Sequence, residues 1–374
     1  MKFTINSGDF LNKVRTLAKA QASKTSMMIL ECIRLELRND SIHLTSSDGN
    51  VTLQTTIPVT NVGDWNQSIC INSQVLISAL SELSNQPIVF IANDQTFAIE
   101  IQYSGGHFQF VGQSSADFPE TSGAHYDMIE IAIPTRVLTS GLDLVKGCVA
   151  NDELRPIMNG VCFDFTSEGL VLVSSDGHKL ARQQYSAVLT DSPQRFVLPT
   201  KAAQIMQLIG KQELDVVVQF DARRAVFTTD DYVFNTVLVE GSFPKYDAVI
   251  PQDNPFMVSI DRDTFISALR RVLVFSDLST NLISLSVTKE QLTIATQDFD
   301  FSQSSEESIS CESNCDMMKI GFKGSFLLNL LRILPQGEIA MSLSDATRAG
   351  VFTPMTQSEN EKLLLLLMPM MLQS

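Results

Sequence analysis

Phe118-Pro119, Phe243-Pro244 and Met368-Pro369 mark one step that recurs along a chain of 374 residues. The prolines are spaced by 125 residues in both intervals. Self-similarity at a fixed period indicates a repeat architecture, and a period of this length matches a whole domain and not a single solenoid turn. The sequence therefore predicts one structural unit written three times.

A second motif recurs near the same spacing. Ser-Ser-Asp-Gly stands at 46–49 and again at 174–177, and a degenerate copy, Thr-Gln-Asp-Phe, stands at 296–299. Each copy follows a short apolar run that is typical of a strand. Two motifs near one offset support three domains. The predicted domains are 1–126, 127–253 and 254–374.

The second copy of this motif also suggests chemistry. Asp176-Gly177-His178 could form part of a hydrolase site with Ser174 or Ser175, because histidine is the commonest general base. Asp and Gly also supply the geometry of a tight turn. The first copy has Asn50 in the place of His178. The recurrence without the histidine favours a structural turn over a catalytic site.

Each repeat has the same pattern of elements. A short alternating strand comes first, followed by an amphipathic helix for which Ser7, Pro134 and Asp261 are suitable entry residues. A second helix and several β-type runs complete the repeat. The helices are expected at 9–20, 134–149 and 261–274, and at 73–84, 200–211 and 323–334. This pattern predicts an α+β domain whose helices and sheets lie in separate layers.

Charge is distributed unevenly between helices and the rest of the chain. The net charge is −15, yet the six helix windows together carry +7, which leaves −22 for the remainder. Lys and Arg are good helix formers, and this alone could explain the difference. If the helices share one surface, that surface would attract a phosphate backbone without reading bases.

Signatures of catalysis and of cofactor binding are missing. The sequence has no phosphate-binding loop, no His-Glu-x-x-His and no nucleophile elbow. Cys311 and Cys315 have metal-like spacing, but no second Cys or His pair stands near them, so two free thiols are favoured. The start of the chain lacks a secretory signal, and the apolar run 363–372 is too short to span a bilayer. We expect a cytoplasmic protein with no metal, no cofactor and no membrane partner.

Across its length the chain resembles the bacterial DNA polymerase III beta subunit, the sliding clamp. Arg155-Pro156-Ile157-Met158-Asn159-Gly160-Val161 is similar to the family's Arg-Pro-Ile-Leu-x-Gly stretch, and Gly241-Ser242-Phe243-Pro244-Lys245-Tyr246 resembles its Gly-x-Phe-Pro-x-Tyr. Further similar segments follow in the family's order, at 1–4, 116–119, 175–181, 320–323 and 367–370.

The resemblance implies three clamp domains per chain, closed head to tail with a second chain into a dimeric ring. Helices would line the hole and sheets would form the outside, so the positive helix surface would face DNA. The implied function is that of a non-enzymatic processivity factor, which encircles duplex DNA of any sequence and tethers the replicative polymerase. The clamp loader and repair proteins would bind through short peptides. The alternative is a clamp-like scaffold paralogue that binds partner peptides without encircling DNA.

The resemblance also implies site residues. The partner pocket, which accepts a peptide often anchored by Gln, Leu and Phe, would comprise Met158, Ser175, Gly177, His178, Lys179, Leu180, Pro244, Val249, Lys323, Phe326, Met368, Pro369 and Met370. The dimer interface would join Phe108 and Phe110 to Val274 and Phe275. The residues expected to contact DNA are Lys24 and Arg155 in loops and Lys13, Lys201 and Lys211 in helix windows.

Each of these assignments has a plainer alternative. Lys24 and Arg155 could be solvated loop cations, and Met368 and Met370 could be core residues. Three departures from the family pattern bear on peptide preference. They are Lys179 in place of Arg, Met371 in place of a basic residue, and Thr280 where an aromatic residue can occur.

Overall fold

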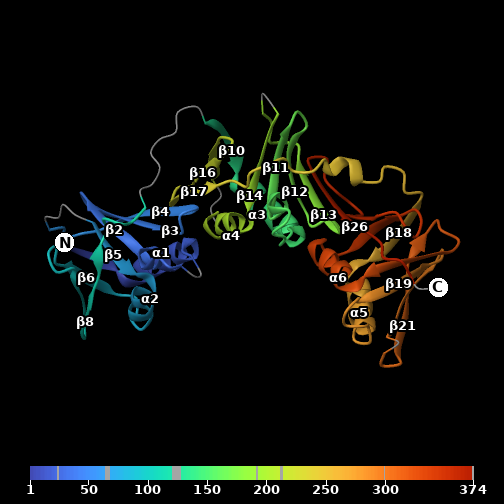
Figure 1. The fold of residues 1–374 in the computed structure, drawn as a ribbon, viewed down its shortest axis with the longest axis horizontal. Coiled ribbons are helices and arrows are strands. Elements are labelled where there is room, and N and C mark those ends of the chain that lie inside the picture. The colour runs from blue at the N-terminus through green and yellow to red at the C-terminus, as the bar shows by residue number, and fades with distance from the viewer. Residues whose placement is uncertain are drawn as a thin grey trace. The chain divides into compact units, whose positions relative to one another are not determined.

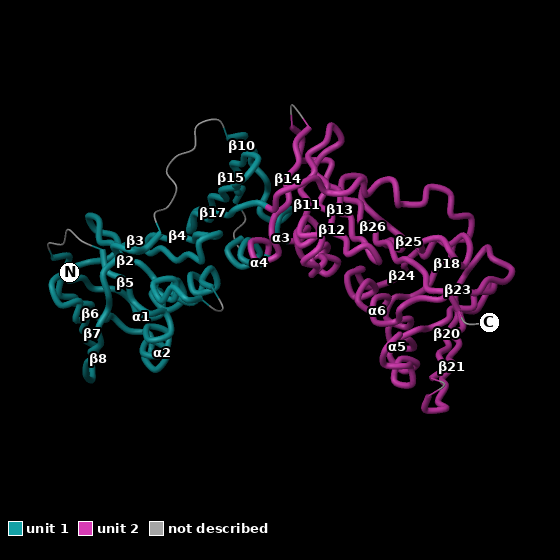
Figure 2. The backbone as a smooth tube through the Cα atoms, in the orientation of Figure 1, with its two compact units in different colours: residues 1–139, 204–238 teal, residues 140–203, 239–374 magenta. Residues whose placement is uncertain are grey.

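The computed structural model describes residues 1–22, 25–63, 68–119, 128–190, 193–210, 214–298 and 300–372. Two compact units contain them (Figure 2). One unit is Met1–Thr139 with Gln204–Leu238, and the other is Ser140–Ala203 with Val239–Ser374. The division runs through the second repeat, because that repeat contributes strands to the largest sheet of each unit.

The first unit contains two antiparallel sheets. The four-stranded sheet has the order β1-β6-β7-β8, with β1 at Lys2–Asn6, β6 at Pro87–Ala92, β7 at Ala98–Tyr103 and β8 at Gly106–Val111. The nine-stranded sheet has the order β10-β15-β16-β17-β4-β3-β2-β5-β9, with β10 at Ile129–Pro134, β15 at Asp215–Phe220, β16 at Arg224–Thr228, β17 at Tyr232–Val237, β4 at Val51–Pro58, β3 at Ser41–Ser47, β2 at Cys32–Arg38, β5 at Ser68–Asn72 and β9 at Gln113–Ser114.

The second unit repeats this arrangement. Its nine-stranded sheet has the order β14-β11-β12-β13-β26-β25-β24-β18-β22, with β14 at Gln194–Pro199, β11 at Gly160–Thr166, β12 at Gly169–Ser175, β13 at Lys179–Tyr185, β26 at Glu361–Leu367, β25 at Gly350–Pro354, β24 at Glu338–Leu343, β18 at Phe256–Asp261 and β22 at Glu312–Ser313. Its four-stranded sheet has the order β21-β20-β19-β23, with β21 at Gln303–Ser310, β20 at Gln291–Asp298, β19 at Leu282–Val287 and β23 at Met318–Lys323.

All six helices predicted from the sequence are present, with ends shifted by a few residues. They are α1 at Ser7–Leu17, α2 at Ser73–Ser81, α3 at Thr135–Val145, α4 at Thr200–Ile209, α5 at Arg262–Leu273 and α6 at Gly324–Ile333. In the first unit α1 packs against α2, and in the second α5 packs against α6 (Figure 1).

The residues that begin the helices differ in part from those predicted. Asn6, and not Ser7, caps α1, because its side chain accepts hydrogen bonds from the backbone N–H groups of Gly8 and Asp9. Ser7 is buried and donates to the Ser84 carbonyl. Asp261 caps α5 as predicted, by accepting from Thr264 N–H at 2.8 Å. Side-chain caps of this kind satisfy amide groups that have no partner inside the helix.

The recurring Ser-Ser-Asp-Gly motif forms the same structure in the first two repeats. Asp48 Oδ1 accepts from the N–H groups of the second and third residues after it, and Asp176 Oδ1 does the same. Gly49 and Gly177 have φ values of 94° and 90°, which favour glycine. The predicted structural turn is confirmed at both positions.

A buried serine in each motif also joins the turn to a helix end. Ser46 Oγ donates to the Leu17 carbonyl at the end of α1 at 2.6 Å, and Ser174 Oγ donates to the Val145 carbonyl at the end of α3. These bonds tie each turn to the end of a helix. The third copy differs, because Thr296 donates to Leu282 on the neighbouring strand. The third motif, whose sequence differs from the other two, therefore also forms a different hydrogen bond.

The three aromatic-Pro or Met-Pro steps do not share one environment. Phe118 is 4% exposed and packs in a cluster with Leu30 and Cys70. Phe243 is 5% exposed and packs in the core of the second unit. Met368 is 40% exposed. The third step therefore presents an apolar side chain at the surface.

The cysteines are free and buried, and burial raises the pKa of Cys70 and of Cys148 to about 12. Cys311 and Cys315 are among these buried thiols. No helix in the described ranges combines the length and apolar character needed to cross a bilayer.

Candidate functional site

A cavity of about 300 Å³ lies in the second unit, and its walls are mainly apolar. It is formed by the 3-10 turn Pro156–Met158, the β12–β13 turn, the loop 243–249 and the end of β26. Nine of the predicted pocket residues line it: Met158, Ser175, Gly177, His178, Lys179, Leu180, Pro244, Val249 and Met368. A concave, apolar site with few polar groups is the usual form of a ligand pocket.

Backbone hydrogen bonds fix the β12–β13 side of the cavity. Ser175 Oγ donates to the Lys179 carbonyl at 2.9 Å and accepts from Gly177 N–H at 3.1 Å, so the turn itself occupies this hydroxyl. The Met368 N–H donates to the His178 carbonyl at 2.8 Å, which holds Met368 beside the turn. His178 is exposed, whereas Lys179 and Leu180 are buried. The exposed imidazole is therefore a polar group presented at this edge.

The charged side chains that line the cavity are Arg155, Lys179 and Lys245. Lys179 is 7% exposed, and its ammonium group lies 2.6 Å from the Gly147 carbonyl and 3.2 Å from Asp176. Arg155 Nε donates to Asp152 at 2.8 Å, and this bond lowers the pKa of the Asp152 carboxyl. Lys179, which stands where the family pattern has Arg, thus stabilises the turn through its two contacts. Arg155, predicted from the sequence to contact DNA, is among the residues that line the cavity.

Four predicted pocket residues, Lys323, Phe326, Pro369 and Met370, are not in the cavity wall. The Phe326 ring, on α6, lies 6.2 Å from the His178 ring, and the ammonium groups of Lys179 and Lys323 lie 5.6 and 4.6 Å from its centroid. These contacts place Lys323 and Phe326 next to lining residues. Pro369 is half-buried.

Met370 pairs with the edge of β23, because its N–H donates to the Gly321 carbonyl at 2.8 Å. A Cβ atom on Gly321 would lie 2.5 Å from the Met370 carbonyl oxygen, so only glycine permits this approach. The structure thus assigns Met370 to anchoring the end of the chain.

The cavity wall contains residues that were not predicted for it. They are Arg155, Phe243, Lys245, Tyr246 and Leu366. Phe243, Lys245 and Tyr246 belong to the Gly-x-Phe-Pro-x-Tyr motif, from which the sequence predicts only Pro244 as a pocket residue. Leu366 is a strand residue whose place in the wall follows from the pairing of β13 with β26. Only that long-range pairing could have indicated it.

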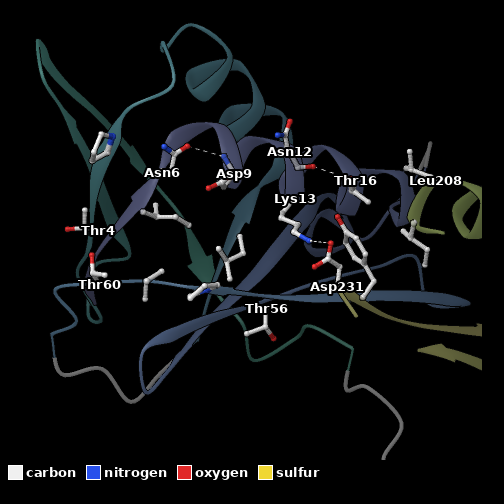
Figure 3. A pocket seen from close by; sticks show the side chains of 17 residues that line it. Thr4, Asn6, Asp9, Asn12, Lys13, Thr16, Thr56, Thr60, Leu208 and Asp231 are labelled. Carbon is white, nitrogen blue, oxygen red and sulfur yellow. Dashed lines mark hydrogen bonds and ion pairs between the residues drawn. The ribbon is translucent and has the colours of Figure 1, made fainter. Parts of the chain in front are cut away.

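Lys13 lies in a second cleft, of about 810 Å³, in the first unit (Figure 3). Its ammonium group is 3.0 Å from Asp231 and 4.3 Å from the centroid of the Tyr232 ring. Lys13 is therefore held in an ion pair inside its own unit. Lys201 is half-buried on α4. Lys24 and Lys211 lie outside the described residues.

The predicted interface residues lie on an edge strand of the first unit and at the end of a helix in the second. Phe108 and Phe110 are half-buried on β8, which is the outer strand of the first unit's four-stranded sheet. Val274 and Phe275 follow α5 and are 73% and 42% exposed. In the same unit β21 is the outer strand of the other four-stranded sheet, and Glu307 on β21 pairs with Arg271 of α5.

Models of three domain families match the chain in succession. They are the N-terminal domain of the DNA polymerase III beta subunit at residues 1–122, the central domain at 132–245 and the C-terminal domain at 247–371. Among curated proteins, the beta sliding clamp of Staphylococcus aureus is 21% identical over 95% of this chain and 96% of that protein. The beta sliding clamp of Treponema pallidum is 24% identical over 93% of this chain and 94% of that protein.

Solved clamps share the fold. The Pseudomonas aeruginosa sliding clamp bound to griselimycin superposes with a TM-score of 0.93 at 21% identity, and the Thermotoga maritima beta subunit with 0.90 at 21% identity. Each comparison covers 100% of both chains. With three consecutive domain matches across nearly its whole length, the chain belongs to the family of DNA polymerase III beta subunits, the non-catalytic sliding clamps.

Proposed function

We propose that two copies of this chain close head to tail into a ring that encircles duplex DNA in the cytoplasm. The ring slides without reading base sequence and tethers the replicative polymerase, the clamp loader and repair proteins, which dock by short peptides. Membership of the sliding clamp family supports this proposal. The observation that supports a closed ring most directly is the pairing of strands between repeats.

Within the chain, two junctions between repeats follow one rule. β4 of the first repeat pairs antiparallel with β17 of the second, and β13 of the second pairs with β26 of the third. In the third repeat, β21 is the counterpart of β4 and β13. By the same rule it should pair with the counterpart of β17 and β26, which is β8 in a first repeat. Neither β8 nor β21 has a second strand partner among the described residues. In a dimer, β8 of each chain would pair with β21 of the other chain, so both unpaired sheet edges would gain a partner strand.

Burial at the internal junctions supports the same interface. Phe234 on β17 and Leu365 on β26 are both 0% exposed. The repeat makes Phe108 on β8 their equivalent, and Phe108 is only half-buried. Val274 and Phe275 add exposed apolar surface at the end of α5. Apolar side chains left exposed at a free sheet edge favour association with another chain.

For DNA, the proposal rests on charge and not on base recognition. The chain has a net charge of −15, and a positive surface on its helices would be needed to hold a duplex. We propose phosphate contacts by Lys24, Lys201 and Lys211, with smaller contributions from Lys13 and Arg155 because Asp231 and Asp152 balance their charges. Contacts to the DNA phosphate backbone carry no sequence information, so retention of the protein on DNA should not depend on base sequence.

For partners, the cavity of about 300 Å³ supplies an apolar site of suitable size for one or two peptide side chains. Val249 and Met368 are 55% and 40% exposed and can cover an inserted Leu or Phe. Methionine adapts its shape readily, which suits a site shared by several partners. His178 would supply a polar edge.

The test is topological. The protein is loaded onto a nicked circular DNA by a clamp loader, and the DNA is then linearised by a restriction enzyme. We expect retention on the circle, loss after linearisation, and retention on linear DNA whose ends are blocked by bound protein. Light scattering after gel filtration should give a dimer. A protein that binds the peptide Gln-Leu-Ala-Leu-Phe but is never retained on circles would instead be a clamp-like scaffold.

A further inference from the structure

A buried carboxylate lies behind the wall of the peptide pocket. Asp164, in the middle of β11, is 5% exposed. Its Oδ2 atom accepts a hydrogen bond from the Tyr246 hydroxyl at 2.7 Å and a second one from Arg195 on β14. A buried charge is tolerated only when it is paired and hydrogen-bonded. The three side chains therefore form one satisfied polar cluster, which we call the Asp164 cluster.

The Asp164 cluster holds the middle of the loop 243–249, which forms part of the pocket wall. Tyr246 is 4% exposed, and the Arg195 guanidinium lies 5.7 Å from the centroid of its ring. Burial and the bond to Asp164 both raise the pKa of Tyr246, so the hydroxyl stays a donor. Phe243, 5% exposed, holds the start of the loop by packing in the core. Between and beyond these two anchors, Pro244, Lys245 and Val249 are exposed and line the cavity.

The other two repeats lack this cluster at the equivalent pair of residues on neighbouring strands. Asp164 pairs in register with Arg195, whereas the equivalent residue of the first repeat, Glu36, pairs with Ser68. In the third repeat the equivalent Ser286 pairs with Lys319. Glu36 forms its ion pairs with arginines of its own strand. Of the three equivalent positions, only the one in the repeat that supplies the pocket wall therefore has an acid–base pair. Because the other two repeats have the same fold without this pair, the fold itself does not require it.

We propose that Asp164, Arg195 and Tyr246 are positioning residues for the peptide pocket: they hold the loop 243–249 in its binding-competent form before a peptide arrives. This inference rests on the proposed peptide-binding function. A pocket whose wall is formed for only part of the time binds with an affinity reduced by that fraction. Preorganisation of this kind increases affinity without adding a contact to the ligand.

The variant that isolates the effect is Tyr246→Phe, which removes only the hydroxyl. Tyr185→Phe is a matched control, because Tyr185 is also buried in the second unit, at 2% exposure, and its hydroxyl lies 3.0 Å from Ser140 Oγ. Tyr185 does not line the cavity. Both variants lose a buried tyrosine hydroxyl bond, and only one of those bonds holds the pocket wall.

Binding of fluorescein-labelled Gln-Leu-Ala-Leu-Phe is measured by anisotropy at equilibrium and by stopped flow. We expect Tyr246→Phe to weaken binding about fivefold, the effect of one net hydrogen bond. The loss should appear in the association rate, because fewer molecules have a formed pocket, while the dissociation rate stays unchanged. Val249→Ala, which removes a contact, should instead raise the dissociation rate. Tyr185→Phe should stay within twofold of the wild type.

Arg195→Lys provides a second variant, since it keeps a positive charge beside Asp164 but loses the planar guanidinium. An intermediate loss in association rate is expected. Equal binding by Tyr246→Phe and Tyr185→Phe, or a change in the dissociation rate alone, would overturn the positioning role. If the wild-type dimer binds no peptide at all, the proposed function of the pocket fails, which is a separate outcome.

Discussion

At Asp176, one carboxylate oxygen accepts two backbone N–H groups at 2.9 Å, and Asp48 repeats the arrangement at 2.8 Å. Hydrogen bonds to a charged group contribute about 1.5–3 kcal/mol each. Ser46 and Ser174 then tie these turns to helix ends. Individual side chains thus set the position of His178 and Leu180, which line the proposed peptide pocket.

Lys13 gives a prediction at this scale. Asp231→Asn removes the partner that lies 3.0 Å from its ammonium group, so the charge becomes available to DNA. We expect tighter association with a labelled duplex at low salt and a log–log salt slope that is steeper by about one. The measurement is anisotropy at a series of salt concentrations.

Asp230→Asn is the matched control, since Asp230 is a neighbouring exposed carboxylate and the change in net charge is the same. Equal effects of the two variants would mean that net charge alone, and not release of Lys13, controls association with DNA.

Among the elements, the strands at the sheet edges form the proposed interface between copies. The internal junctions predict the register of β8 against β21 of a second copy. Val233 pairs with Gln54, and Leu364 pairs with Arg182. In the repeat, His107 is equivalent to Val233 and Leu364, and Glu306 is equivalent to Gln54 and Arg182. We therefore expect His107 to lie opposite Glu306 at each junction between chains.

A charge exchange tests this register. His107→Glu places two carboxylates opposite each other, which costs about 0.2–1 kcal/mol per pair, and the closed dimer contains two such pairs. The dimer dissociation constant, measured by sedimentation, should rise severalfold. Adding Glu306→Lys should restore it. A double variant no tighter than His107→Glu alone would contradict the register.

The sequence revealed elements more reliably than their pairing. The helices at 73–81 and 262–273 follow from local apolar spacing and capping residues, and both are close to the predicted ranges. The pairing of β4 with β17 joins strands far apart in the chain, which no local pattern records. For the same reason no local pattern indicates the structural role of Tyr246. Its partner Asp164 lies on a strand 82 residues away and is recognisable only in the folded structure.

For the pocket, the resemblance located the β12–β13 turn and the Phe-Pro loop, both of which form walls of the cavity. It did not separate wall residues from their neighbours. Met370 belongs to the predicted set, but its backbone pairs with Gly321. The resemblance implied a DNA contact for Arg155, whose side chain also lines the cavity and whose guanidinium bonds to Asp152. Side-chain direction in loops depends on tertiary contacts, which sequence similarity does not specify.

On the scale of the whole molecule, ring closure should depend on a small apolar contact. Phe275→Arg introduces a charge at an exposed aromatic position that the proposed interface would bury, and burying an unpaired charge is strongly unfavourable. We expect monomers by light scattering at low micromolar concentration, with an unchanged circular dichroism spectrum. Retention on nicked circles should be lost.

Leu189→Arg is the control, because Leu189 is 65% exposed and lies in the same unit but outside the proposed interface. This variant should remain dimeric and be retained on DNA. A Phe275→Arg protein that is still dimeric would place the interface elsewhere.

The two outer strands, β8 and β21, differ in sequence, so the proposed contact between copies would be heterologous. A chain damaged only at β8 and a chain damaged only at β21 would each fail to close alone. Mixed together, they retain one intact pair of edges and should form a dimer with a single junction. Such a dimer is a linear object with two ends, so it could bind partner peptides at full strength and yet never be topologically linked to a circle.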